Sequence, residues 1–326
     1  MKAITYHRYG NPQVLKLEEV PVPACGEKDV LIRVHAAEAT KADCEMRSFR
    51  FSVLWFWVPL RLALGITAPR RKVLGSYFAG EIVETGSRAD TDLKVGDAVF
   101  GTSNIRLGAY GQYAAIPASS TVVNKPANMN FTDAAAVPLG GLNALHFLRL
   151  ANLQSGQRIL ILGAGGSIGA YAIQIAKSLG AHVTSVDKAS KEAFVRAQGS
   201  DDFIDYTTSD PLSGDARYEV IFDMVPGSDF RRCLSVLTPG GHYLLGNARF
   251  SAILRAIVTN RVAGRKKVRV KLAAESRQEL SELRELIEGG ALTSIVDRVL
   301  PMKDAAQAHT LVETETRQGA VVIRME

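Results

Sequence analysis

Cysteine is scarce in this sequence, and its scarcity excludes two classes of protein. Among 326 residues the only cysteines are Cys25, Cys44 and Cys233. An odd number of widely separated cysteines fits neither a disulfide framework nor a cysteine-rich zinc site. The sequence also lacks an apolar signal core after Met1 and any apolar run of about 18 residues, the length that a membrane span requires. We therefore expect a cytoplasmic protein in a reducing compartment.

Proline and charged residues are infrequent as well. The chain has 12 prolines, 22% charged residues and 47% hydrophobic residues, without low-complexity stretches or tandem repeats. This composition excludes a disordered chain, since ample apolar surface is available for burial. The length is too great for one ordinary core and suits two domains.

Acidic residues are missing from one long segment. Between Asp229 and Glu275 no Asp or Glu occurs, although the net charge of the chain is only +6. The alternation Lys267–Lys271 favours a solvated strand face, while attraction to anionic lipid and binding of nucleic acid are the alternatives. Nucleic acid is disfavoured because no aromatic residue interrupts the cluster from Arg261 to Lys271. The basic residues are Arg231, Arg232, Arg249, Arg255, Arg261, Arg265, Lys266, Lys267, Arg269 and Lys271.

The distribution of apolar residues predicts two kinds of domain. Short apolar runs bounded by turn residues, such as Asp29–His35 and Gly80–Gly86, predict antiparallel strands in the first part of the chain. A helix capped by Thr132 or Asp133 follows, and Arg158–Gly246 then alternates strands with amphipathic helices, which predicts a parallel sheet. A helix over Arg277–Glu288 and a strand over Ala320–Arg324 close the chain. The predicted domains are residues 1–122 with 275–326, and residues 123–274.

A glycine-rich turn is the strongest local signal. It follows the apolar strand Ile159–Leu162 and precedes a helical pattern. Glycines here permit a tight turn and a close approach of backbone N–H groups to a pyrophosphate at a helix N-terminus. This context favours dinucleotide binding over a purely structural turn. The expected cofactor-binding residues are Gly163, Ala164, Gly165, Gly166, Ser167, Ile168 and Gly169.

Asp187, at the end of the next strand, bears on the choice of cofactor. A carboxylate there accepts hydrogen bonds from the ribose 2′-OH of NAD and repels the 2′-phosphate of NADP. Lys188 and Lys191 follow it directly and could instead hold that phosphate. These residue types therefore do not decide between NAD and NADP as the cofactor.

Further motifs spread over the whole chain occur together in one superfamily. They are Gly75–Glu81, Val95–Val99, Gly108–Tyr113, Leu237–Gly241 and Gly319–Ile323. With the glycine-rich turn, they resemble the medium-chain dehydrogenase/reductase superfamily in its zinc-free, quinone oxidoreductase-like branch. The resemblance implies a GroES-like β-rich catalytic domain and a Rossmann doubly wound parallel-sheet domain, with the cofactor between them. It also implies a dimer or a tetramer, of which we expect a homodimer, and it slightly favours NADPH over NADH.

The positions that bind catalytic zinc in metal-dependent members carry other residues here. They match Thr40 and Ser76, and neither side chain is a zinc ligand, since zinc prefers thiolate, imidazole or carboxylate. The four-cysteine lobe of those enzymes is also missing from the sequence around residues 100–112. We therefore expect an enzyme without zinc.

The resemblance implies hydride transfer to a conjugated acceptor. A site without a Lewis acid can place a nicotinamide against an electron-poor carbon and donate hydrogen bonds to the oxygen that gains charge. Quinones and α,β-unsaturated carbonyls suit this chemistry. The alternative is a cofactor-binding protein with little turnover that binds a membrane surface or nucleic acid through its basic face.

Candidate hydrogen-bond donors to the substrate are Thr40, Tyr77 and Tyr110, with Asp43 as an orienting group. Tyr77 stands where relatives place an acidic residue, and it either reaches the substrate or packs beside Phe78. Further cofactor contacts are expected from Asn143, Val225, Gly246 and Asn247.

An apolar insert at residues 51–64 holds both tryptophans of the chain and a single charge, Arg61. We favour a wall for a bulky apolar acceptor over core or dimer packing and over shallow insertion into a membrane. The expected partners are a small-molecule substrate and a second copy of the chain. Contact with a membrane surface and with nucleic acid is disfavoured.

Overall fold

The computed structural model describes all residues except 52–60, 63, 247–249, 263–265 and 271–274. The chain forms two compact units, of which the first contains Met1–Leu139 and Glu275–Glu326 and the second contains Gly140–Ala274. The domain limits expected from the sequence, residues 1–122 with 275–326 and residues 123–274, stay a prediction. The insert at residues 51–64 falls mostly outside the described residues.

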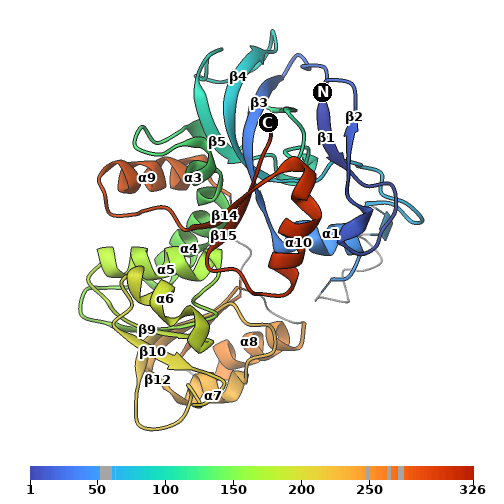
Figure 1. Cartoon of the computed structure of the whole chain (residues 1–326). Coiled ribbons are helices and arrows are strands. Elements are labelled where there is room, and N and C mark those ends of the chain that lie inside the picture. Colours follow the sequence, from blue (N-terminus) through green and yellow to red (C-terminus); the bar gives the residue numbers. More distant parts are fainter. Residues whose placement is uncertain (52–60, 63, 247–249, 263–265, 271–274) are drawn as a thin grey trace. The chain divides into compact units, whose positions relative to one another are not determined.

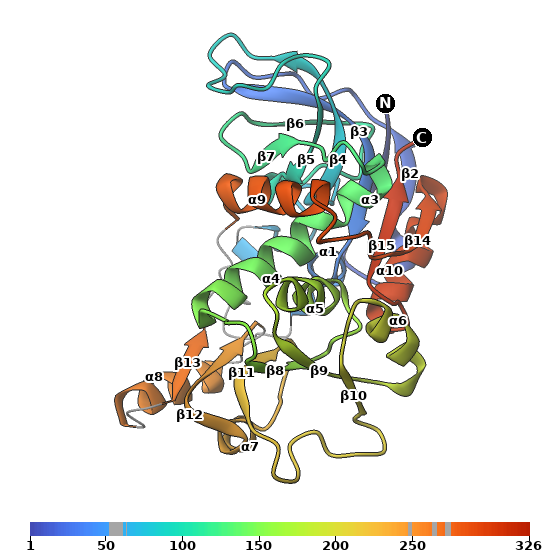
Figure 2. The same ribbon diagram turned by 90° about the vertical axis from the view of Figure 1, so that its left-hand side faces the viewer.

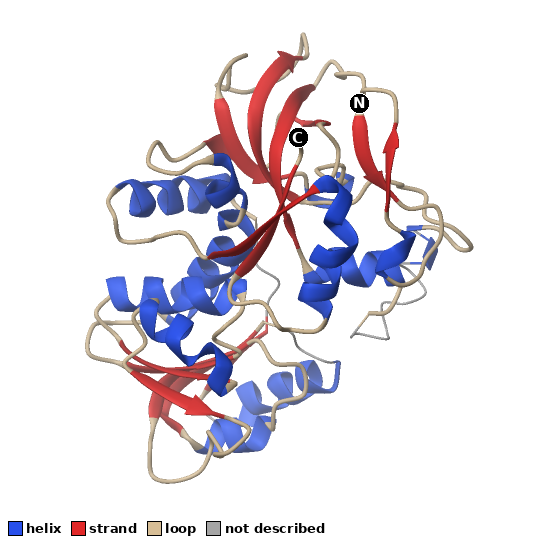
Figure 3. Cartoon of the chain, in the orientation of Figure 1, coloured by secondary structure: helices blue, strands red, loops and turns tan. Residues whose placement is uncertain are grey.

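The first unit is built on a largely antiparallel sheet, drawn as red arrows in Figure 3. The strand order is β14-β15-β3-β4-β5-β7, with β6 pairing β3, and β1 pairs with β2 separately. Only β14 and β15 run parallel among the described pairs of this sheet. The strands are β1 (Lys2–Thr5), β2 (Lys16–Glu19), β3 (Asp29–Ala39), β4 (Tyr77–Thr85), β5 (Ala98–Thr102), β6 (Tyr113–Pro117), β7 (Val122–Asn124), β14 (Val296–Pro301) and β15 (Ala320–Arg324).

The strands predicted in this unit are confirmed. Asp29–His35 lies in β3 and Gly80–Gly86 overlaps β4, and the two strands pair with each other. The predicted strand Ala320–Arg324 is β15, which pairs with the other side of β3. The C-terminal strand therefore completes the sheet of the N-terminal unit.

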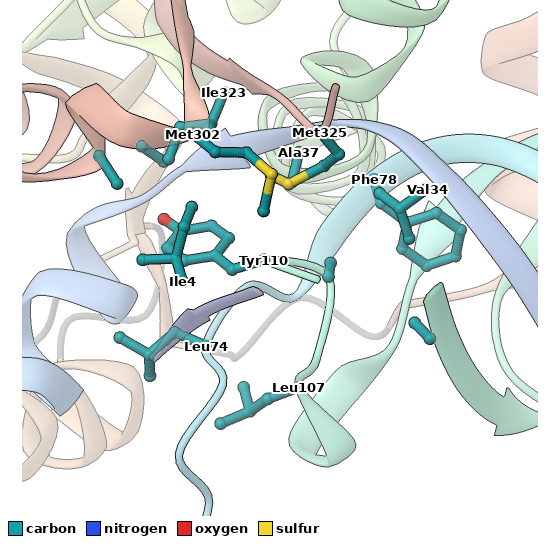
Figure 4. Close-up of a cluster of buried hydrophobic side chains, with 14 of the residues drawn as sticks. Ile4, Val34, Ala37, Leu74, Phe78, Leu107, Tyr110, Met302, Ile323 and Met325 are labelled. Atoms are coloured by element: carbon teal, nitrogen blue, oxygen red, sulfur yellow. The ribbon is translucent and has the colours of Figure 1, made fainter. Parts of the chain in front are cut away.

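A hydrophobic core joins the two ends of the chain within the first unit. Figure 4 shows Met302 and Met325 beside Ile4 and Tyr110. Met302 and Met325 come from the C-terminal segment, whereas Ile4 lies in β1. Each such apolar side chain contributes about 1.5–3 kcal/mol when it is fully buried. Burial of this kind is the physical reason why residues 275–326 pack with the first unit.

The helices α1, α3, α9 and α10, labelled in Figure 1, belong to the first unit with this sheet. They are α1 (Lys41–Ser48), α3 (Phe131–Ala135), α9 (Arg277–Glu288) and α10 (Ala305–Glu313). The predicted helix Arg277–Glu288 is confirmed as α9, with Ser276 accepting a hydrogen bond from the Glu279 N–H. The predicted cap of α3 was wrong, because Asn130 accepts the bond from the Asp133 N–H. Asparagine is among the best N-cap residues, and it stands just before the helical pattern.

The second unit contains a parallel sheet with the strand order β10-β9-β8-β11-β12-β13. Figure 2 shows α5 and α6 on one side of this sheet and α7 and α8 on the other. The helix α4 (Val137–Ala151) begins in the first unit and continues in the second. The strands are β8 (Arg158–Leu162), β9 (His182–Asp187), β10 (Asp202–Asp205), β11 (Tyr218–Asp223), β12 (Leu237–Leu245) and β13 (Lys267–Val270). The helices are α5 (Ser167–Ser178), α6 (Glu192–Ala197), α7 (Phe230–Ser235) and α8 (Phe250–Val262).

The order of these strands changes the direction of the chain connections at the edge of the sheet where the carboxyl ends of β8 and β11 lie. From β8 the chain moves outward to β9 and β10, and then returns to β11 on the other side of β8. The connections that leave the carboxyl ends of the paired strands β8 and β11 therefore run in opposite directions, which makes this a topological switch point. Open parallel sheets bind ligands at such points.

Candidate functional site

The glycine-rich turn connects the carboxyl end of β8 to the start of α5, at the edge of the sheet formed by the carboxyl ends of its strands. Gly163 has φ +81°, a conformation that a residue with a side chain rarely adopts. A Cβ atom at Gly169 would lie 2.6 Å from the carbonyl oxygens of Gly163 and Ala164. These two glycines are therefore required by the fold of the turn itself.

Gly166 has a different role, because the space around it is open. A Cβ atom at Gly166 would have only the Gly163 oxygen, at 3.8 Å, within 4 Å. Gly166 is the N-cap residue of α5 and supplies no side-chain hydrogen bond to the first turn. The N–H groups at the start of a helix lack intrahelical partners and carry partial positive charge. The turn thus fits a pyrophosphate above Gly166.

Asp187 ends β9 beside the turn and is already engaged there. Its Oδ2 accepts a hydrogen bond of 2.8 Å from the Gly165 N–H, and its Oδ1 accepts one of 2.8 Å from the Lys188 N–H. The Nζ of Lys191 lies 3.6 Å from Oδ1, and both side chains of this ion pair are buried. A Cβ atom at Gly165 would lie 2.4 Å from Cδ of Lys191, so the lysine stem covers this glycine. Lys188 is exposed.

The ends of β11 and β12 border the same edge. The Asp223 carboxylate accepts hydrogen bonds from the Tyr243 hydroxyl at 2.7 Å and from the Val225 N–H at 2.9 Å. Val225 is 45% exposed, and its Cγ2 would be 3.3 Å from a Cβ atom at Gly163. The Gly246 N–H donates to the Asp223 carbonyl oxygen at 3.0 Å. Asp223 thereby positions Val225 and Gly246, both of which are expected to contact the cofactor. The sequence analysis did not identify Asp223, because its burial depends on its place in the folded sheet.

The remaining expected cofactor contacts have different outcomes. Asn143 is half-buried in α4 of the second unit. Asn247 lies outside the described residues.

Burial raises the pKa of the Asp223 carboxyl, while the hydrogen bond from Tyr243 opposes this shift.

Thr40 and Asp43 form a capping box at the start of α1. The Thr40 hydroxyl donates to Oδ2 of Asp43 at 2.6 Å, and the Asp43 N–H donates back to the Thr40 oxygen at 3.1 Å. The Thr40 N–H also donates to Oδ2, and the Gly75 N–H donates to Oδ1 at 3.1 Å. The two side chains thus satisfy the first turn of α1 and fix it to the Gly75 loop.

A buried chain of hydrogen bonds continues from Asp43 into α10. The Tyr110 hydroxyl lies 3.4 Å from Oδ2 of Asp43 and 3.1 Å from Nε2 of His309. Nδ1 of His309 lies 3.3 Å from Sγ of Cys44. Asp43, Tyr110 and His309 are fully buried, and Cys44 is nearly so. No pattern in the sequence indicates that His309 joins this group, since it lies 265 residues from Cys44.

Burial shifts the pKa values of two residues in this chain of hydrogen bonds in opposite directions. Burial raises the pKa of Asp43 from 3.8 to about 6, although the hydrogen bonds from Thr40 and Gly75 oppose the shift. Burial, with a smaller contribution from Arg47, lowers the pKa of His309 from 6.5 to about 3. His309 is therefore neutral at pH 7.

Tyr77 makes no hydrogen bond to this chain among those described, and it is half-buried, whereas the other three catalytic candidates are fully buried. Its hydroxyl donates to Oε1 of Glu275 at 2.7 Å, and the Thr102 hydroxyl lies 3.4 Å from Oε2 of the same carboxylate. Burial and the adjacent Glu275 raise the pKa of Tyr77, which keeps its O–H protonated. Glu275 is a second residue that sequence reasoning missed.

The side chains at the two positions matched to zinc ligands make other hydrogen bonds. Thr40 is the cap of α1, and the Ser76 hydroxyl lies 3.5 Å from the Asn104 carbonyl oxygen. Within the described ranges, no three His, Cys, Asp or Glu residues are grouped so that they could hold a metal ion. A separate observation concerns membranes: none of the described helices has the length and apolarity needed to cross one.

We predict that Thr40→Ala destabilises the first unit by about 1–2 kcal/mol, because it removes the cap of α1 and one donor to a buried carboxylate. Thr40→Ser keeps the hydroxyl and should lose less than half of that amount. Urea denaturation at pH 7 measures both variants. Equal losses in the two variants would show that the methyl group, not the hydroxyl, matters.

Comparison with known proteins identifies the family. Residues 26–127 match the alcohol dehydrogenase GroES-like domain, and residues 198–323 match the family described as zinc-binding dehydrogenase. The chain is 29% identical over 336 residues to a 2-methylene-furan-3-one reductase of Solanum lycopersicum, covering 99% of this chain and 79% of the relative. It is 30% identical, with the same coverage, to a chloroplastic NADPH-dependent alkenal/one oxidoreductase of Arabidopsis thaliana.

A solved structure agrees with these relatives. The quinone oxidoreductase from Coxiella burnetii has a TM-score of 0.87 and 28% identity, covering 100% of this chain and 99% of that one. The expected fold class, a GroES-like domain with a Rossmann doubly wound domain, is thereby confirmed. The chain belongs to the medium-chain dehydrogenase/reductase superfamily, in its quinone oxidoreductase-like branch, and it is an enzyme, an oxidoreductase.

Proposed function

We propose that the enzyme transfers hydride from NADPH to a quinone or to an α,β-unsaturated carbonyl compound with an apolar body, and that it needs no zinc. The observation that carries the proposal is the open glycine turn at the start of α5, with two lysines beside it. The names of the relatives support it, since one is an NADPH-dependent alkenal/one oxidoreductase and another a quinone oxidoreductase.

The residues of the second unit have distinct roles in holding this cofactor. The first turn of α5 binds the pyrophosphate above Gly166. Lys188 and Lys191 bind the 2′-phosphate, and Asp187 holds Lys191 in place. Val225, Gly246 and Asn143 are proposed as contacts toward the nicotinamide. When bound, the cofactor supplies the hydride, which only needs an acceptor carbon held in the right geometry.

Among the four catalytic candidates, we assign contact with the substrate to Tyr77. Its protonated hydroxyl can donate a hydrogen bond to the oxygen that gains negative charge, in exchange for its bond to Glu275. Thr40, Asp43 and Tyr110 are buried. They are proposed as positioning residues that fix α1 and the loop at Gly75.

The direct test is a titration of the purified protein with NADPH and with NADH, followed by cofactor fluorescence. A quinone and an enal are then added while cofactor oxidation is measured. We expect tighter binding of NADPH and oxidation that depends on the acceptor and persists with a strong chelator. Binding without any acceptor-dependent oxidation would favour the cofactor-binding protein with little turnover. Loss of activity on chelation would contradict zinc independence.

The choice of NADPH makes a specific prediction for Lys188. Lys188→Ala removes a charge-assisted hydrogen bond to the 2′-phosphate, worth about 1.5–3 kcal/mol. We expect the Kd for NADPH to rise roughly 10- to 100-fold, while the Kd for NADH changes less than about threefold. Lys188→Arg should restore most of the affinity, and Lys28→Ala, an exposed lysine of the first unit, serves as the control. If both cofactors weaken equally, Lys188 does not contact the phosphate.

A further inference from the structure

The hydroxyl of Tyr77, which we assign to the substrate, is already used in a hydrogen bond within the first unit. It donates to Oε1 of Glu275 at 2.7 Å. A hydroxyl group has a single proton to donate, so in this arrangement none is left for the oxygen of a substrate. Tyr77 can therefore act on a substrate only when the state of Glu275 changes.

Glu275 is held in place by its side chain and by its backbone. Its Oε2 lies 3.4 Å from the Thr102 hydroxyl at the end of β5. The Thr102 oxygen accepts a bond from the Asn104 N–H, so its own proton is free to donate to Glu275. The Thr121 hydroxyl donates to the carbonyl oxygen of Glu275 at 2.9 Å. The helix α9 follows directly and packs beside β7, as Figure 2 shows. These contacts fix the carboxylate against the Tyr77 hydroxyl.

The partners of this carboxylate are hydroxyl groups. Among the described residues, Tyr77 and Thr102 bond to it and no cationic side chain does. Arg277 lies two residues further on, but its guanidinium donates to the carbonyl oxygens of Ala118 and Ser120. An ion-paired carboxylate resists protonation, whereas one bonded by hydroxyls can take up a proton and reverse the direction of a hydrogen bond. Glu275 is half-buried, so solvent can exchange that proton.

The surroundings of Tyr77 oppose the loss of its proton unless another proton replaces it. Burial and the adjacent Glu275 raise its pKa most, and Glu38 on β3 and Asp43 in α1 raise it further. A phenolate at this position would lie near three carboxyl groups. Tyr77 can thus release its proton when a second proton reaches the same oxygen. Glu275 is the described group that is bonded to that oxygen and can carry one.

We propose, building on the proposed function, that Glu275 is the proton source behind Tyr77. In its protonated form Glu275 donates to the Tyr77 oxygen, and the Tyr77 O–H is then free to donate to the substrate oxygen. Glu275 acts on the substrate through Tyr77 and does not touch it.

The transfer of electrons and protons balances for an enone. The hydride adds an electron pair to the β-carbon, the C=C pair shifts, and negative charge collects on the carbonyl oxygen. The O–H bond of Tyr77 breaks as a new O–H bond forms on that oxygen, and the proton of Glu275 moves to Tyr77. The enol that results rearranges to the saturated carbonyl compound in water, and solvent returns a proton to Glu275. A quinone takes up one hydride and one proton in the same way and becomes a hydroquinone.

The first test is Glu275→Gln, since glutamine keeps a hydrogen bond to Tyr77 but has no proton to give. We expect kcat with an enal to fall about 100-fold at pH 7, while KM changes less than about threefold. The kcat of the wild type should decrease from about pH 5 to about pH 9, because ionised Glu275 cannot donate, and that of the variant should stay constant. Glu275→Asp should keep at least about a tenth of the wild-type kcat. Glu285→Gln, at an exposed glutamate of α9, is the control.

A second measurement does not depend on turnover. Infrared difference spectra between the wild type and Glu275→Gln, recorded at several pH values, isolate the C=O stretch of protonated Glu275. We expect this band to disappear over the same pH range in which the wild-type kcat falls. Tyr77→Phe should shift the band, because the phenolic oxygen that accepts the proton is gone. If Glu275 is ionised throughout that range, it is not the proton source.

The outcomes separate this proposal from the proposed function. No oxidation of NADPH by the wild type with any quinone or enal would overturn the proposed function and the role of Glu275 with it. An active wild type, with the same kcat and pH profile in Glu275→Gln, would overturn the role of Glu275 alone. Full activity of Tyr77→Phe would overturn the assignment of Tyr77 to the substrate. An unchanged NADPH affinity and urea midpoint would show that the variants are folded.

Discussion

Gly166→Val is expected to weaken NADPH binding at least 100-fold while the protein stays folded. Gly166 has φ −93° and ψ 174°, a conformation open to any residue, and its added Cβ would meet nothing closer than 3.8 Å. The valine side chain would therefore fill the space above the first turn of α5. Two or more charge-assisted hydrogen bonds to a pyrophosphate would be lost, at about 1.5–3 kcal/mol each. Fluorescence titration measures the affinity, and the urea midpoint measures stability.

The matched control is Gly169→Val in the same turn. There a Cβ atom would lie 2.6 Å from two backbone oxygens, so the substitution should destabilise the second unit by several kcal/mol. Gly166→Ala, with a smaller side chain, should lose less affinity than Gly166→Val. If Gly166→Val binds NADPH normally, the pyrophosphate does not lie above Gly166, and the proposed cofactor site is wrong.

His309→Gln is expected to change how stability depends on pH. Burial lowers the pKa of His309 from 6.5 to about 3, so the unfolded chain takes up this proton first. The stability contributed by the neutral ring is fully present above pH 6.5 and is lost as the pH falls toward 3, which amounts to about 5 kcal/mol over that range. Glutamine can still bond to Tyr110 and does not titrate. Relative to the wild type, the variant should gain about 3 kcal/mol between pH 7 and pH 4.

The contribution of Asp43 to stability has the opposite pH dependence, so it would mask the contribution of His309 if only the wild type were measured. Burial raises its pKa from 3.8 to about 6, so its contribution is fully present below pH 3.8 and is lost as the pH rises through 6. That contribution, about 3 kcal/mol, opposes the one from His309 over the same range. Urea denaturation of both proteins at pH 7, 5 and 4 separates the two. His7→Gln, at an exposed histidine, is the control.

A constant difference between His309→Gln and the wild type from pH 7 to pH 4 would contradict the prediction. It would mean that His309 is protonated as readily in the folded chain as in the unfolded one. The buried hydrogen-bond chain through Tyr110 would then have to be described differently.

The second unit was largely predictable because its signals are local. The strand before Gly163, the glycines of the turn and the strand that ends at Asp187 are adjacent in sequence, and their periodicity predicts β8, α5 and β9. The sequence did not decide whether Asp187 or the lysines that follow it contact the cofactor. The structure adds that its carboxylate is bound by the Gly165 N–H and lies beside Lys191.

The site in the first unit was predictable only in part. Thr40 and Asp43 are three residues apart, so their capping box follows from local spacing. Tyr110, His309 and Glu275 have partners that are between 67 and 265 residues distant. Contacts at such separations leave no periodic signal in a single sequence.

The sequence by itself determined the parallel sheet of the second unit, the turn at Gly163, and the capping box of Thr40 and Asp43. These depend on residue type and short-range spacing, which act before the chain is compact. Only the tertiary structure decided that burial lowers the pKa of His309 and raises the pKa of Asp43. The reason is physical: desolvation and hydrogen-bond pairing depend on which distant segments become neighbours when the core forms.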